Sequence, residues 1–272
     1  MKKRFIILID FSPYSANLLR YAYDWSKKVD AELVLVHNTI VVTPALTDNE
    51  GRREIANITN RDVYEKLQNF AQSILPEKMQ VRYFVSERNL VLSLPELLQE
   101  PFENLIFLGI KGTGILKKIF LGSVAVQVID HVNNMIVAVP KNIENFSSKT
   151  MHVAVSKNYP INIVEFNKFL RFTGNNIEKI AFFSLVKPDD DLQATERYLK
   201  ELKDLYREQK VTTYELYQGK NIFQDIKNVI SHKADELLVV QRGSRLFSDQ
   251  IFRKFFINEL VYEGETPLII LP

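Results

Sequence analysis

The sequence contains no cysteine, and it has only 4 histidines among its 272 residues. Without cysteine the chain has no disulfide, no thiolate nucleophile and no cysteine-ligated zinc or iron–sulfur centre. The histidines are scattered along the chain, so a structural metal site is not expected. The sequence also lacks paired carboxylates, a nucleophile elbow and any Ser/His/Asp arrangement that would indicate a hydrolytic enzyme.

Long hydrophobic runs and an excess of one charge are missing as well. The basic start Met1–Arg4 and the apolar run Phe5–Ile9 resemble a signal peptide, but Asp10 ends the run early. It is too short for a signal core of about 7–15 residues or a membrane span of about 20. The net charge of +2 gives no broad field toward nucleic acid or an anionic membrane. We therefore expect a soluble, cytoplasmic protein with neither as its partner.

Short apolar runs rich in β-branched residues alternate with helical patterns, which is typical of a parallel sheet covered by helices. In the first half the predicted strands are Phe5–Ile9, Leu33–His37, Val81–Val85, Leu105–Leu108 and Met135–Val139. Two helical faces are formed by Leu18, Ala22, Trp25 and Val29, and by Val63, Leu67, Phe70 and Ile74. The predicted fold class is α/β, with right-handed crossovers between parallel strands.

The second half of the chain repeats this order after a polar stretch. Residues 105–140 align without a gap with residues 237–272, so that Gly109 falls on Gln241. Nearer the front Ile9 aligns with Val155, which makes the second copy shorter before its fourth strand. We predict two tandem five-stranded domains, residues 1–140 and 151–272, joined by a linker of residues 141–150.

The extra length of the first copy is assigned to the segment Asn38–Asn60, which contains Pro44 and Gly51. A connection of this length is either a lid beside a ligand site or a solvated loop. Both interpretations stay open.

A glycine-rich loop follows the fourth predicted strand. It begins Gly109-Ile110-Lys111-Gly112-Thr113-Gly114 and ends at Gly122-Ser123-Val124, where a helix is predicted to begin. Glycine lets backbone approach a ligand closely, and a Gly-Ser pair opening a helix offers N–H groups, a hydroxyl and the positive end of the helix dipole. Because ligands of open parallel sheets bind at the carboxyl ends of strands, Asp10 should lie at the same edge. The loop therefore favours a phosphate ligand.

The pattern G-x2-G-x9-G followed by Ser or Thr resembles that of the nucleotide-binding universal stress proteins, at Gly109, Gly112, Gly122 and Ser123. Asp10-Phe11-Ser12 is similar to the first loop of that family, and the resemblance extends over both halves of the chain. It implies doubly wound sheets with the strand order 3-2-1-4-5. Phe11 departs from the family pattern because glycine is frequent there, and Asn38 departs because valine is frequent.

The resemblance also implies a nucleotide site. The outer glycines of the loop should approach the ribose and phosphates, and Ser123 with the amide of Val124 should bind phosphate oxygen. Asp10 should lie near the ribose or a bound metal, and the backbone around Asn38 near adenine. Lys111 is the loop lysine that is the best candidate for a phosphate contact. The predicted nucleotide-binding residues are Asp10, Asn38, Leu108, Gly109, Lys111, Gly112, Gly122, Ser123 and Val124.

Purely structural interpretations stand beside these. Ser123 is also a plausible helix N-cap, and Asp10 a plausible turn cap. Ser12 followed by Pro13 is better explained as an N-cap and first helical residue. His37, at the end of an apolar strand, is better explained as a satisfied core histidine than as a catalyst.

The second copy departs from the loop pattern at every diagnostic position. Gln241, Ser244, Lys254 and Phe255 replace the glycines and serine, and Ser156 replaces Asp10. We therefore predict that this copy does not bind ATP in the manner of the family.

The leading functional hypothesis is a regulatory protein of the stress response whose first domain binds ATP, with or without Mg²⁺. A slow ATPase or nucleotide-dependent transferase is the alternative from the enzyme class, although the sequence supplies no catalytic base. The third hypothesis is a structural or interaction module. The last strand of each half is where family members pair, so we expect the two halves to form an intrachain pseudo-dimer; a homodimer and a further protein partner are alternatives.

Overall fold

The computed structural model describes residues 1–77, 79–110, 123–186, 190–218, 222–230, 235–244 and 266–272. Its strands are β1 (Lys2–Leu8), β2 (Ala31–Asn38), β3 (Val81–Ser86), β4 (Phe102–Gly109), β5 (Ile136–Val139), β6 (Thr150–Ala154), β7 (Lys179–Val186), β8 (Val211–Gln218), β9 (Glu236–Gln241) and β10 (Leu268–Leu271). The helices in these ranges are α1 (Ser15–Val29), α2 (Asn49–Gln72), α3 (Leu90–Leu98), α4 (Ser123–His131), α5 (Ile163–Thr173), α6 (Leu192–Tyr206) and α7 (Ile222–Ile230).

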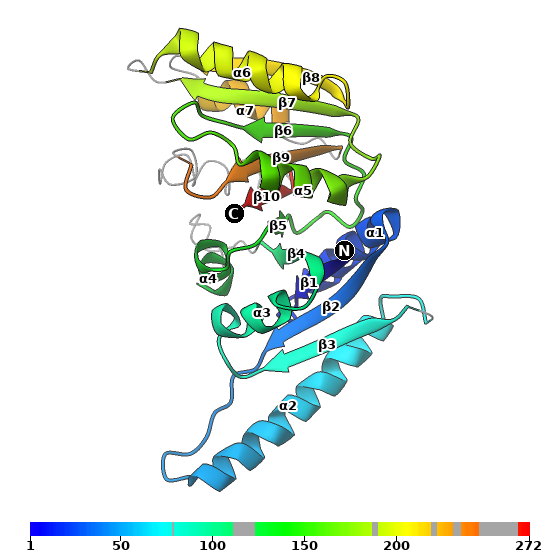
Figure 1. The fold of residues 1–272 in the computed structure, drawn as a ribbon. Helices are drawn as coiled ribbons and strands as arrows, with labels where there is room; N and C mark the ends of the chain where they lie inside the picture. Colours follow the sequence, from blue (N-terminus) through cyan, green and yellow to red (C-terminus); the bar gives the residue numbers. More distant parts are fainter. Residues whose placement is uncertain (78, 111–122, 187–189, 219–221, 231–234, 245–265) are drawn as a thin grey trace.

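The strands form one 10-stranded sheet in the order β3-β2-β1-β4-β5-β10-β9-β6-β7-β8 (Figure 1). This confirms the predicted order 3-2-1-4-5 in the first half, and β8-β7-β6-β9-β10 has the same order read from the other edge. Within each half all pairs are parallel, whereas β5 and β10 pair antiparallel across the centre. The last strands of the two halves therefore meet at the centre of the sheet.

The sheet register agrees with the sequence alignment of the two halves. Gly109 pairs with Val139 in β4 and β5, and Gln241 pairs with Leu271 in β9 and β10. Gln241 therefore occupies in the second half the place that Gly109 occupies in the first.

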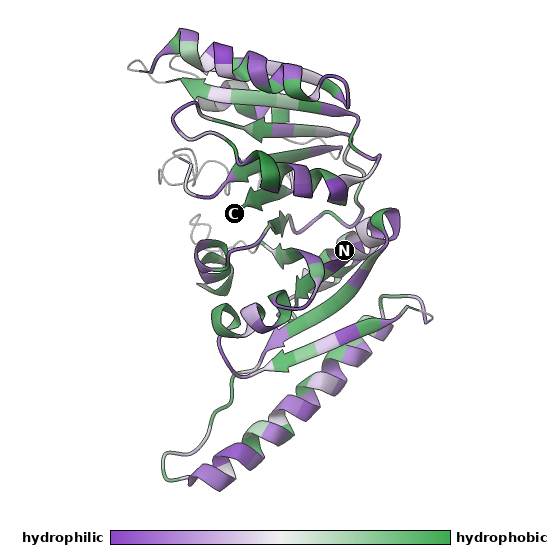
Figure 2. Cartoon of the chain, viewed as in Figure 1, coloured by the Kyte–Doolittle hydropathy of each residue, from purple (hydrophilic) through white to green (hydrophobic). Residues whose placement is uncertain are grey.

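Helices cover both faces of the sheet. Side chains of α1, α2, α5 and α6 pack on one face with Phe5 and Ile7, while α3, α4 and α7 pack on the other with Ile6. Neighbouring residues of a strand point to opposite faces, so a strand buried on both sides is an almost continuous apolar run. Figure 2 shows the hydrophobic residues concentrated in the strands and the hydrophilic ones on α2 and α6. None of the helices in the described ranges has both the length and the hydrophobicity that crossing a bilayer requires.

The segment Asn38–Asn60 is not a loop throughout its length, because α2 begins at Asn49. Asp48 caps this helix: its carboxylate accepts a hydrogen bond from Gly51 N at 2.8 Å. Only Ala56, Leu67 and Ala71 of α2 are buried. The apolar stripe is therefore too sparse in the first turns to predict the helix from periodicity.

The segment between β5 and β6 packs tightly against the first half. Phe146 is fully buried and stacks on Trp25 with a centroid distance of 4.0 Å. Trp25 Nε1 in turn donates to the carbonyl of Phe172 in α5 at 2.6 Å. One hydrophobic core thus continues from α1 through this segment into α5.

Candidate functional site

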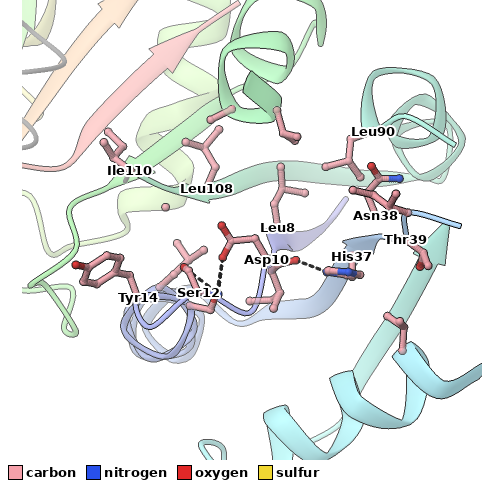
Figure 3. A pocket seen from close by; sticks show the side chains of 18 of the residues that line it. Leu8, Asp10, Ser12, Tyr14, His37, Asn38, Thr39, Leu90, Leu108 and Ile110 are labelled. Carbon is pink, nitrogen blue, oxygen red and sulfur yellow. Dashed lines mark hydrogen bonds between the residues drawn. The ribbon is translucent and has the colours of Figure 1, made fainter. Parts of the chain in front are cut away.

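A pocket of about 580 Å³ opens at the carboxyl ends of β1, β2 and β4 in the first half (Figure 3). In an open parallel sheet this edge, where the chain changes its winding direction, is the usual ligand site. The volume lies within the range of about 300–1,000 Å³ for small-molecule sites. The location and the size are therefore those of a ligand pocket.

The loop after β1 supplies the acidic group of the pocket. Asp10 Oδ1 accepts hydrogen bonds from Ser12 N at 2.9 Å and from Ser15 Oγ at 2.8 Å. Both bonds fix the carboxylate beside the start of α1. The expectation that Ser12 caps this helix is wrong, because α1 begins at Ser15 with Tyr14 at the cap and no side-chain capping bond. Ser12 is part of a turn instead, since its carbonyl accepts from Ser15 N.

The end of β2 forms the opposite side of the pocket. His37 Nδ1 lies 2.7 Å from the carbonyl oxygen of Ile9. A carbonyl can only accept, so Nδ1 carries the proton and the imidazole has a hydrogen-bond partner, as predicted. The predicted place in the core is wrong, because His37 is half-buried and lines the pocket. Asn38 Nδ2 donates to the carbonyls of Ser86 and Arg88, at 2.9 Å each. The Asn38 side chain thus fixes the connection that follows β3.

The end of β4 and the first turn of α4 close the third side. Leu108, Gly109 and Val124 line the pocket here. A Cβ built on Gly109 would meet only Leu18 Cδ2, at 3.9 Å, and the φ angle of Gly109 is not positive. Neither backbone conformation nor packing within the described chain therefore requires glycine at this position. Its missing side chain leaves open space in the pocket.

The predicted site residues divide into two groups. Those that line the pocket are Asp10, Asn38, Leu108, Gly109 and Val124. Lys111, Gly112 and Gly122 lie outside the described residues, and so does the side chain of Ser123. The pocket thus brings together residues that are far apart in the sequence, as the strand-end rule predicts.

Several lining residues were not predicted from the sequence. Among them are Thr39 and Ile40 after β2, Thr59 and Val63 of α2, and Leu90 of α3. Thr59 and Val63 are four residues apart and lie on one face of α2. This helical spacing was not recognised, because the segment Asn38–Asn60 was assigned to a loop. Thr39 gives no sequence signal beyond its place next to Asn38.

The described lining has little charge. Asp10 is its only Asp, Glu, Lys or Arg residue, and most of the others are apolar. Within the described ranges there is no group of three His, Asp or Glu side chains that could hold a metal ion. A single carboxylate still fits Mg²⁺, which is usually bound by one or two carboxylates together with substrate phosphates. Lys111, the predicted phosphate contact, lies outside the described residues, and the described lining supplies no Lys or Arg for an anion.

The corresponding place in the second half is filled by side chains. Gln241 Oε1 accepts a hydrogen bond from Asn162 N at 2.6 Å, so this side chain spans the gap to the start of α5. Ser244 is buried and its Oγ donates to the carbonyl of Gln241 at 2.6 Å. Lys254 and Phe255, the other replaced positions, lie outside the described residues. Among the described residues, the place beside Gln241 is therefore occupied by a side chain where the place beside Gly109 is open.

Comparisons with known proteins agree with this architecture. The model of the universal stress protein family matches residues 1–140. A universal stress protein from Archaeoglobus fulgidus DSM 4304 superimposes with a TM-score of 0.63 at 15% identity, covering 100% of this chain and 99% of that one. A putative universal stress protein from Pseudomonas aeruginosa UCBPP-PA14 gives 0.56 at 13% identity, with coverages of 99% and 93%.

A protein of another kind has a similar fold. The cytoplasmic domain of a prokaryotic cation chloride cotransporter gives a TM-score of 0.55 at 12% identity, covering 99% of this chain and 95% of that one. No curated protein matches the sequence. At these identities the structural similarities establish the fold alone.

Proposed function

The chain belongs to the universal stress protein family, and from that premise we propose that its first half binds an adenine nucleotide, ATP accompanied by Mg²⁺. Family membership supports a role in the stress response. The proposed action is regulatory: the bound nucleotide favours one arrangement of the loops around the pocket. A ligand can do so only by binding one conformation more tightly than another.

The open space at Gly109 is the observation that carries this proposal. Among the described residues a Cβ there would have one contact, at 3.9 Å, and yet the residue is glycine in a strand otherwise rich in large apolar side chains. Glycine in a strand often marks a bulge, a bend or a place where a ligand approaches the backbone closely. Close approach of a ligand is the explanation that agrees with a pocket at this point.

The pocket lining supports a division of roles. The Asp10 carboxylate, held by Ser12 and Ser15, suits the hydroxyls of a ribose or a Mg²⁺ ion. The apolar side chains Leu8, Leu90 and Leu108 suit the faces of a base. The phosphates would extend toward the start of α4 and the lysines of the loop, where helix N–H groups favour anions.

The test is a comparison of wild type with Gly109→Leu in nucleotide binding, measured by isothermal titration calorimetry with ATP and Mg²⁺. The leucine side chain would extend into the open space, so we expect an affinity loss of at least about tenfold, equivalent to about 1.4 kcal/mol. Gln241→Ala is the matched control at the same register of the second half, and its affinity should equal that of wild type. Circular dichroism should report the same secondary structure in all three proteins.

Two results would contradict the proposal. One is an unchanged affinity in Gly109→Leu, which would place the ligand elsewhere. The other is wild-type protein that neither releases a nucleotide on denaturation nor binds added ATP.

A further inference from the structure

Thr39, directly after β2, combines deep burial with an unused hydroxyl. Its side chain lines the pocket (Figure 3), and the residue is only 4% exposed. The backbone N–H of Thr39 donates to the carbonyl of Ser86 at 2.8 Å. Its Oγ1 has no hydrogen-bond partner in the part of the chain that the structure describes.

An unpaired buried hydroxyl destabilises a folded protein relative to an apolar group of the same shape. Valine has that shape, and it also favours extended backbone at least as strongly as threonine does. The fold therefore gains nothing from the Thr39 hydroxyl. A partner that does not belong to the described chain would explain it.

The neighbouring polar side chains are already bound to the protein. His37 Nδ1 donates to Ile9, Asn38 Nδ2 to Ser86 and Arg88, and Thr59 Oγ1 to the carbonyl of Ile55 at 2.7 Å. The donors of these three groups are thereby used. Among the described polar side chains on the β2 side of the pocket, Thr39 is the one whose side chain is buried and has no hydrogen bond to the chain.

Thr39 lies on the opposite side of the pocket from Gly109 and the start of α4. In the sheet, β1 separates β2 from β4, and Figure 3 shows Thr39 and Leu90 on one side and Ile110 on the other. A nucleotide with its phosphates at α4 would place its base on the β2 side. A hydroxyl both donates and accepts, so it can pair with a ring nitrogen or an exocyclic amine.

We infer that the Thr39 hydroxyl binds the polar edge of the nucleotide's base and is a specificity-determining residue of this pocket. The inference rests on the proposed function, and it goes beyond it by naming the group that recognises the heterocycle. A base with hydrogen-bonding atoms at this edge would be bound in preference to an apolar ring, because the ring would leave the hydroxyl unpaired.

The test uses full-length Thr39→Val and Thr39→Ser with AMP and ATP as probes. Thr39→Val removes the hydroxyl and keeps the shape, so it should weaken both nucleotides by the same factor, roughly tenfold. Thr39→Ser keeps the hydroxyl and should stay within about threefold of wild type. Without ligand, Thr39→Val should melt at the same temperature as wild type or higher, a result that a merely structural hydroxyl would not give.

Three outcomes would overturn the inference: unchanged affinities in Thr39→Val, a loss confined to ATP, or a lower melting temperature of that variant without ligand. A lower melting temperature would mean that another part of the chain uses the hydroxyl. If wild type binds neither AMP nor ATP, the proposed function itself fails. Binding by wild type with equal binding by Thr39→Val refutes the Thr39 contact alone.

Discussion

Phe11, in the loop after β1, has a backbone conformation that favours glycine. Its φ angle is +55°, in the left-handed region, which costs a non-glycine residue roughly 1–2 kcal/mol. The aromatic ring offsets this cost through its contacts: its centroid lies 4.7 Å from that of His37 and 5.8 Å from that of Phe70, and Lys66 Nζ lies 4.3 Å above the ring. The ring thus anchors the loop that carries Asp10 to α2.

Replacing Phe11 should therefore give an unusual order of stability. Both Phe11→Gly and Phe11→Ala lose the ring contacts, but only alanine retains the strain, so we expect the glycine variant to be more stable by about 1 kcal/mol. Urea unfolding of the two variants measures the difference. Tyr23, in the interior of α1, is the matched control, and there alanine should be the better replacement. If the two Phe11 variants are equally stable, or if the alanine variant is the more stable one, the loop relaxes out of the left-handed conformation.

Some residues of the site could be predicted from the sequence and others could not. Asp10 and Gly109 were predictable because parallel strands bring their carboxyl ends to one edge, whatever their distance in the sequence. Thr39 was not, because a threonine with an unpaired hydroxyl is indistinguishable from a hydrogen-bonded one until its neighbours are placed. The same applies to Arg4: a charged residue beside an apolar run does not predict complete burial.

Arg4 of β1 joins four elements of the first half. It is fully buried, its Nε donates to Asn104 Oδ1 of β4 at 2.8 Å, and a second nitrogen donates to the carbonyl of Leu97 in α3. Arg4 Nη1 donates to Glu100 Oε2 at 2.7 Å, and Glu100 also accepts from Arg82 of β3. The hydrogen bond from Arg82, supported by the charge of Arg4, lowers the pKa of Glu100 below its ordinary value of 4.5. This network fixes the end of α3 to three strands.

The depressed pKa predicts how stability depends on pH. Glu100 is easier to protonate in the unfolded chain, so it stabilises the fold above pH 4.5, and this contribution is lost as the pH falls through the lower folded-state pKa. Glu100→Gln should cost about 2 kcal/mol at pH 7, because it leaves the buried Arg4 without its counter-ion, and its melting temperature should fall less steeply below pH 4.5.

Glu96 supplies the control for this prediction. It lies in α3 and pairs with Arg88, but both side chains are about half exposed, so Glu96→Gln should change the melting temperature little. Thermal unfolding followed by circular dichroism between pH 3 and pH 7 compares the three proteins, roughly spanning the carboxylate range. Parallel pH profiles for wild type and Glu100→Gln would contradict the assigned role.

A helix or strand was predictable from the sequence where its apolar residues recur with the period of its backbone. β1 begins at Lys2 and β4 at Phe102, each three residues before the predicted start, because the backbone of these mostly polar ends still pairs in the ladder. The first turns of α2 were missed for a related reason: they extend beyond the core and carry few buried residues. The spacing of apolar residues indicates which residues are buried. It indicates a helix or a strand only where the whole element is packed against the core.

At the scale of the whole molecule, the two halves share one core as well as one sheet. Phe172 of α5 lies 6.1 Å from Phe5 of β1 between ring centroids, and its carbonyl accepts from Trp25. Arg171 of α5 pairs with Glu103 of β4, which extends the contact to the surface. A chain of this length commonly unfolds in steps, but continuous packing of this kind couples the stability of the halves.

Trp25 is the chain's single tryptophan, so its fluorescence reports on the contact between the halves. Phe166 lies deep in the second half, where its ring contacts those of Phe182 and Tyr206. Phe166→Ala should cost about 3–5 kcal/mol. If the halves unfold together, this substitution must shift the Trp25 transition to lower urea by the same amount as the circular dichroism transition, although Phe166 has no ring contact with Trp25 among the described residues. A Trp25 transition that stays at its wild-type midpoint while the circular dichroism curve splits in two would mean that each half unfolds independently.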